Sequence, residues 1–211
     1  MRSYRLLCPI ARALDLLGDR WTLLILRDLH PGPARFSDLH AGLPGLATNL
    51  LTTRLQTLQR DGLIQHRASE SGKVYELTEE GERSAGVLFE LARFGSRVPH
   101  PDDPKPTGNL RLVAVTLKEA LRRSGPGTLE AELTIDGEPF AISMDDSRVD
   151  VRYEANAKAG LRVSTQYLSL LGAIEGDIPA REFLASHVTV EKGGKRRVAD
   201  LFDRIGRGLA G

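Results

Sequence analysis

The sequence predicts an α+β protein with two folded domains of different kinds. Its 211 residues exceed what one small hydrophobic core needs and are enough for two cores. Apolar residues make up 41% and charged residues 27%, which excludes collagen-like and mostly disordered chains. A proline-rich stretch at 98–108 separates a mainly helical half from a half in which strands and helices mix. We therefore expect domains at 1–97 and 109–211, joined by a linker at 98–108.

Apolar periodicity and capping residues predict the elements of the first half. Asp19 is placed to cap a helix, and Gly62 suits the left-handed end of a later one. In that later helix, Leu51, Leu55 and Leu58 share the side expected to face the core. Helices are predicted at 9–17, 20–29, 36–40 and 47–61, with a long helix from Thr78, and strands at 63–68 and 74–78.

The opposite side of the helix at 47–61 carries hydrogen-bonding side chains and few carboxylates, a composition that suits DNA bases and phosphates. The order helix, helix, turn, helix, hairpin is that of a winged helix-turn-helix, whose second motif helix enters the major groove. A polar helix face is also typical of a merely solvated surface, and Arg35 has an alternative as an ion-pair partner. The predicted DNA contacts are Arg35, Thr48, Asn49, Thr52, Thr53, Gln56, Arg60, Arg67 and Lys73.

Six short motifs characterise the first half. They are Cys8-Pro9 and the segments 21–26, 35–39, 51–55, 61–64 and 75–81. Together they resemble the HxlR-type (DUF24) transcriptional regulators over about residues 6–95. The resemblance implies a MarR-like homodimer that binds operator DNA and uses its first and last helices as the dimer surface. The single cysteine fits a reducing cytosol, so we expect a cytoplasmic protein. The sequence departs from the family at Ala47, where the family has serine, and in the second wing strand, which lacks the family's proline.

Cys8 is the only cysteine and has two interpretations. A single cysteine cannot form an internal disulfide or a multi-cysteine metal cluster. A lone cysteine near a helix start is most often a small buried apolar residue. The alternative is a redox-sensing thiol, because a helix N-terminus and neighbouring arginines favour the thiolate. The family resemblance implies the same role, since some HxlR-type members respond to electrophiles through a cysteine at this place.

The second half combines alternating apolar strands with amphipathic helices, the pattern of an α+β domain. The pair Asp136-Gly137 predicts a tight turn between strands at 129–135 and 138–144, and Ser164 is placed to cap a helix. Further strands are predicted at 149–153, 161–163 and 188–191, and helices at 112–121, 164–171, 178–185 and 197–209. No phosphate-binding glycine loop and no catalytic or metal-ligating constellation is present, so we expect neither an enzyme nor a cofactor.

From about residue 127 to 209 the order of elements resembles a sterol-carrier-protein-2-like domain. The resemblance implies an apolar tunnel for lipids or acyl chains, and hence an apolar small molecule as effector. Because pockets are mostly apolar with a few convergent polar groups, Tyr153 and Gln166 are expected to orient the ligand. Alternatively, the apolar candidates fill a core. The candidates for the cavity lining are Ile142, Met144, Val151, Leu168, Leu171 and Phe183.

These patterns predict a DNA-binding transcriptional regulator, a repressor, whose second domain binds an apolar effector. The alternative is a lipid or acyl carrier, or a protein-interaction module, that does not bind DNA. Double-stranded DNA and a second copy of the chain are the expected partners. No segment approaches the roughly 18 consecutive apolar residues that a membrane-spanning helix needs, so we expect no membrane insertion.

Overall fold

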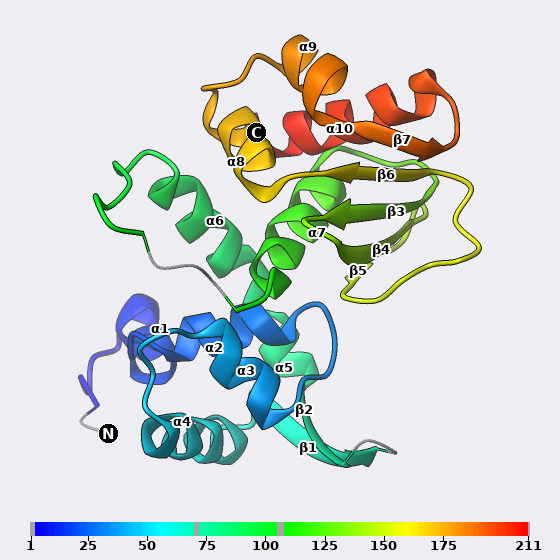
Figure 1. Ribbon diagram of the computed structural model, residues 1–211. Coiled ribbons are helices and arrows are strands. Elements are labelled where there is room, and N and C mark those ends of the chain that lie inside the picture. Colours follow the sequence, from blue (N-terminus) through cyan, green and yellow to red (C-terminus); the bar gives the residue numbers. More distant parts are fainter. Residues whose placement is uncertain (1–2, 70–71, 105–107, 211) are drawn as a thin grey trace. The chain divides into compact units, whose positions relative to one another are not determined.

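The computed structural model describes residues 3–69, 72–104 and 108–210 (Figure 1). Predictions for residues 70–71 of the hairpin turn and 105–107 of the linker lie outside these ranges. The chain forms two compact units. The first comprises Met1–Leu88 and Asp103–Leu112, and the second comprises Phe89–Asp102 and Val113–Gly211. None of the helices in the described ranges is long and apolar enough to cross a membrane.

The first unit is a winged helix-turn-helix, as predicted. Its helix-turn-helix and wing follow from capping and burial: Asp19 Oδ1 accepts the backbone N–H of Trp21 at 3.0 Å, and Gly62 adopts a φ of 75°. Leu51, Leu55 and Leu58 are buried, which confirms the predicted inner side. Its elements are α1 (Pro9–Leu17), α2 (Thr22–Leu29), α3 (Phe36–Gly42), α4 (Thr48–Arg60), β1 (Ile64–Ser69), β2 (Gly72–Leu77) and α5 (Glu79–Glu82), and α6 (Ala85–Gly95) begins in this unit and continues into the second.

The single long helix predicted from Thr78 is wrong, because the structure has α5 and α6 in its place. Thr78 caps α5 by accepting the Gly81 N–H at 3.1 Å. The Gly81 carbonyl then accepts the Ser84 N–H at 3.0 Å and the Ser84 hydroxyl at 2.7 Å. In a continuous helix this carbonyl would accept from residue 85. Ser84 is also held by the buried His30, whose Nε2 lies 3.0 Å from the Ser84 hydroxyl.

The second unit is a five-stranded sheet with helices, in the strand order β5-β4-β3-β6-β7. β3 and β6 are parallel, and the other neighbours are antiparallel. The turn at Asp136-Gly137 is confirmed, with φ values of 48° and 85°. α7 packs against α10 and β5 (Figure 1). η1 (Arg111–Val113) spans the boundary between the two units, and the further elements are α7 (Ala114–Arg123), β3 (Leu129–Ile135), β4 (Glu138–Met144), β5 (Val149–Arg152), β6 (Arg162–Thr165), α8 (Tyr167–Glu175), α9 (Ala180–Glu182), η2 (Phe183–His187), β7 (Thr189–Lys192) and α10 (Lys195–Ala210).

The prediction that Ser164 caps a helix is wrong. Ser164 lies in β6 opposite Thr189, and α8 begins two residues after Thr165, with Gln166 as its N-cap. The strand extends to this point because Val163 and Thr165 are buried on the same side of the sheet, which continues the period-two pattern. The stabilisation that a serine cap at this position would give a helix is smaller than that from burying the side chains of the strand.

Candidate nucleic-acid interface

The exposed side of α4 presents polar side chains opposite its three buried leucines. Asn49, Thr52, Thr53 and Gln56 are all exposed. The hydroxyls of Thr52 and Thr53 donate to the carbonyls of Thr48 and Asn49 at 3.0 and 2.9 Å, which fixes these side chains against the helix. Asn49 Oδ1 accepts the Leu50 N–H at 2.8 Å, so its NH₂ group remains the outward donor. The helix thus displays a fixed hydrogen-bonding surface.

The last turn of α3 adds a residue, His40, that the sequence did not single out. His40 is exposed, stacks on Phe36, and places Nε2 3.5 Å from the Thr48 hydroxyl. α3 is the first helix of the helix-turn-helix motif, and the position of His40 near its end could have identified this residue from the sequence. Arg35 is exposed immediately before α3, where its backbone N–H donates to Asp38 at 2.9 Å. This leaves the guanidinium of Arg35 on the surface.

The wing presents two exposed cations in different environments. Arg67 Nε lies 2.8 Å from the carboxylate of Glu76, and this hydrogen bond lowers the pKa of Glu76 below its usual value. Gln65 donates to the same carboxylate at 3.0 Å. Lys73 instead places Nζ 5.3 Å from the ring centre of Tyr75. The wing therefore offers one ion-paired and one ring-stacked cation.

Two further arginines of α4 serve different purposes. Arg60 is exposed and pairs with the neighbouring Asp61 at 3.0 Å, a surface contact of little net strength that a phosphate can replace. Arg54 is half-buried and pairs with Asp19 at 2.7 Å. Arg54 therefore fixes α4 against the segment before α2. The structure brings the nine predicted DNA-contact residues to the exposed parts of α3, α4 and the wing, and their contacts with DNA stay a prediction.

Exposed apolar side chains follow α1 and α6. Leu7 and Ile10 are exposed at the start of α1, and Leu91 and Phe94 are exposed on α6. Cys8 is also exposed, at the N-cap of α1, which differs from the interpretation that it is a small buried residue. Its redox role stays a prediction.

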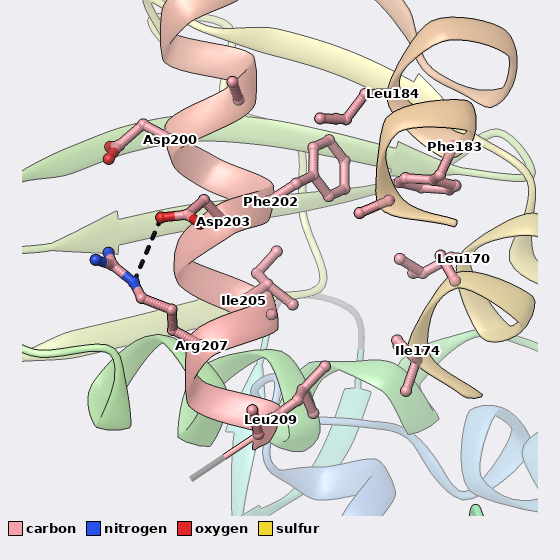
Figure 2. Close-up of a pocket in the computed structure, with 15 residues that line it drawn as sticks. Leu170, Ile174, Phe183, Leu184, Asp200, Phe202, Asp203, Ile205, Arg207 and Leu209 are labelled. Carbon is pink, nitrogen blue, oxygen red and sulfur yellow. Dashed lines mark ion pairs between the residues drawn. The ribbon is translucent and has the colours of Figure 1, made fainter. Parts of the chain in front are cut away.

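The second unit contains a cavity of about 880 Å³ between α10 and the segment formed by α8, α9 and η2. Figure 2 shows Phe202 and Ile205 of α10 facing Phe183, Leu170 and Ile174 across this cavity. The rings of Phe183 and Phe202 pack edge to face, with 5.2 Å between their centroids. The charged lining residues point away from these apolar side chains, and Asp203 pairs with Arg207 at 3.4 Å.

Of the eight predicted ligand contacts, only Phe183 lines this cavity. Leu168 is 76% exposed, and Gln166 is the exposed N-cap of α8. The Tyr153 hydroxyl donates to Glu138 at 2.6 Å. Ile142, Met144 and Val151 are buried in the sheet, and Leu171 is half-buried on α8. Among the described residues, no group of three or more histidine, cysteine, aspartate or glutamate side chains is placed to hold a metal ion.

Comparison with known proteins identifies the first unit. Residues 16–103 match the model of the HxlR-like helix-turn-helix family. An uncharacterized HTH-type transcriptional regulator of Synechocystis sp. is 36% identical over 93 residues, which are 43% of this chain and 69% of that protein. The HTH-type transcriptional regulators YvaP and YodB of Bacillus subtilis are 33% and 30% identical, over 43% and 46% of this chain and 87% and 90% of their own lengths. The chain therefore belongs to the HxlR-like helix-turn-helix family of transcriptional regulators.

Proposed function

We propose that this regulator binds operator DNA as a homodimer, with α4 in the major groove, and represses transcription. The observation that carries the proposal is the exposed polar side of α4, backed by three buried leucines. Helix faces of this kind read base edges when a helix-turn-helix holds them in the groove. A dimer bound over a promoter excludes RNA polymerase, and we therefore propose repression rather than activation.

The exposed apolar side chains of α1 and α6 support the homodimer. Leu7 and Ile10 on α1, and Leu91 and Phe94 on α6, face solvent in the single chain. A large apolar side chain that is exposed in the single chain is a candidate for burial against a partner, and each of the two helices carries such side chains. A twofold dimer presents two copies of α4 to half-sites about 34 Å apart, one turn of the duplex.

A gel-shift assay with the DNA upstream of the protein's own gene tests this proposal. Asn49→Ala is expected to weaken specific binding by about 1 to 3 kcal/mol and to relax the preference at one base pair, because Asn49 loses its outward amide donor. Ser186→Ala, an exposed polar position in the second unit, is the control and should bind like the wild type. If the wild type gives no salt-sensitive retardation, the carrier or protein-interaction alternative is favoured.

We also propose that residues 109–211, beyond a linker at 98–108, form a sterol-carrier-protein-2-like domain that binds an apolar effector, separate from a DNA-binding domain at 1–97. The cavity between α8 and α10 supports this, since its volume and apolar lining suit a small molecule. Regulation then requires that the effector bind the DNA-competent and DNA-incompetent states with different affinities.

A fluorescent fatty acid such as cis-parinaric acid is a suitable probe for the cavity. Ala173→Phe adds a ring to the cavity lining and is expected to weaken probe binding about tenfold, or about 1.4 kcal/mol. Leu168→Ala, on the same helix but outside the cavity, should leave the affinity unchanged. The opposite result, loss of binding in the Leu168 variant alone, would contradict the assignment of this cavity.

A further inference from the structure

The second unit carries a group of cationic side chains that its fold gathers from four segments. We call it the basic cluster. Its members come from the loop after β5, the start of β6, the end of β7 and the start of α10. All are exposed except Arg162, which is half-buried. The basic cluster comprises Lys158, Arg162, Lys192, Lys195, Arg196 and Arg197.

Hydrogen bonds to one loop show that these segments meet. Lys192 Nζ donates to the Ala159 carbonyl at 3.0 Å, and Arg197 donates to the Gly160 carbonyl at 2.9 Å. Arg162 donates to the Ala157 carbonyl at 3.3 Å and lies opposite Lys192 in the sheet. Three long cationic side chains therefore converge on the backbone of 157–160.

The charges of the basic cluster are not neutralised by ion pairs. Carbonyl groups are neutral acceptors, and none of the six side chains forms a salt bridge with a carboxylate of the described residues. Elsewhere in the second unit, Arg122, Arg152 and Arg204 each pair with an acidic residue. When the carboxylates of Glu130, Glu132, Glu154 and Glu191 are counted, six cations stand against four anions, and Asp200 of α10 is paired with Arg204.

The backbone at the start of α10 adds to this positive potential. α10 has 16 residues and follows Gly193-Gly194. The N-terminus of such a helix carries about half a positive charge and has unpaired N–H groups. Gly193 adopts a φ of +104°, and a Cβ there would lie 2.8 Å from Leu161 Cδ1, so glycine is needed for this close approach.

We propose that the basic cluster is a second DNA-contact surface, which binds phosphates of the duplex outside the bases read by α4. The inference rests on the proposed function. On the α4 and wing surface, Arg60 and Arg67 are ion-paired, while Arg35 and Lys73 form no ion pair with a carboxylate of the described residues. A DNA-binding protein gains most of its sequence-independent affinity from lysine and arginine contacts with phosphates. The basic cluster adds six further cations to these two.

The test is the salt dependence of operator binding by the full-length protein. Lys158, Lys195 and Arg196 are exposed, and their side chains form no hydrogen bond or ion pair with the rest of the described chain, so the triple variant Lys158→Gln/Lys195→Gln/Arg196→Gln should fold normally. Each lost phosphate contact flattens the slope of log K against log salt by about 0.9, so three contacts per subunit, which are six in the proposed dimer, flatten it by about 5.4. The base preference should be unchanged, because phosphate contacts carry no sequence information.

A triple variant with the same charge change elsewhere, Arg83→Gln/Arg148→Gln/Arg181→Gln, is the control and should keep the wild-type slope. Normal operator binding with an unchanged slope in the basic-cluster variant would overturn this inference alone. Absence of retardation by the wild type would overturn the proposed function itself. The slope could be unchanged while the wild type, but not the variant, cosediments with phosphatidylglycerol vesicles. This result would contradict DNA as the partner of the basic cluster and would identify an anionic membrane instead.

Discussion

Arg111→Ala is expected to destabilise the first unit by about 3 to 5 kcal/mol, the cost typical of removing one partner from a buried ionic contact. Arg111 is only 5% exposed. Its guanidinium donates to the carbonyls of Asp28 at 2.6 Å, of Gly32, and of Pro33 at 3.2 Å. A buried carbonyl that loses its donor costs about 1 to 3 kcal/mol, and of these three bonds the one to Asp28 is buried and the other two are partly buried. The substitution removes all of these bonds at once.

The carboxylate of Asp28 adds to the expected cost. Asp28 is fully buried, and this burial raises the pKa of its carboxyl above the usual value, while the positive charges of Arg27 and Arg111 lower it in part. Loss of Arg111 removes one of the two positive charges that stabilise the ionised carboxylate of Asp28. Arg111→Lys keeps the charge but not the planar fork of donors, so it should recover only part of the stability.

Trp21 is the only tryptophan and lies in the first unit, so its fluorescence follows urea unfolding of that unit. Arg83→Ala is the control, since the ion pair of Arg83 with Glu80 is exposed and is expected to contribute less than about 1 kcal/mol. If the Arg111 and Arg83 variants unfold at the same urea concentration as the wild type, Arg111 does not stabilise the unit in this way.

The role of Arg111 shows where prediction from sequence stops. Periodicity found the leucines inside α4, and the Asp-Gly pair located the hairpin turn, because both signals come from neighbouring residues. Arg111 contacts residues about 80 positions earlier in the sequence. The pair between Arg54 and Asp19 is likewise distant in sequence. A side chain's partner across such a separation follows from tertiary packing alone.

The cavity was difficult to predict for a related reason. Alternation identified Ile142 and Val151 as inward-facing strand residues, and both are fully buried. Alternation cannot show whether the space that such residues face is filled or hollow. The cavity instead lies between α8, η2 and α10, which are separated in the sequence and come together only in the tertiary fold. Phe183 was found because it is both apolar and placed in one of these helical segments.

Gly208→Ala and Gly206→Ala are expected to change stability in opposite directions, although the two positions are two residues apart in α10. A Cβ on Gly208 would lie 1.8 Å from the carbonyl oxygen of Ala120 in α7. Backbone atoms cannot move aside as a side chain does, so α10 must shift from α7, at a cost of about 1 to 3 kcal/mol. A Cβ on Gly206 meets no atom within 4 Å.

Gly206→Ala should therefore stabilise the second unit by about 0.5 to 1 kcal/mol, because alanine loses less backbone entropy than glycine in a helix. The two shifts should appear in urea unfolding followed by far-UV circular dichroism and leave the Trp21 fluorescence transition in place. The Gly208 variant should also bind the fatty-acid probe more weakly, because α10 forms one wall of the cavity. Equal stability of both variants would mean that the approach of α10 to α7 is not set by the missing side chain at Gly208.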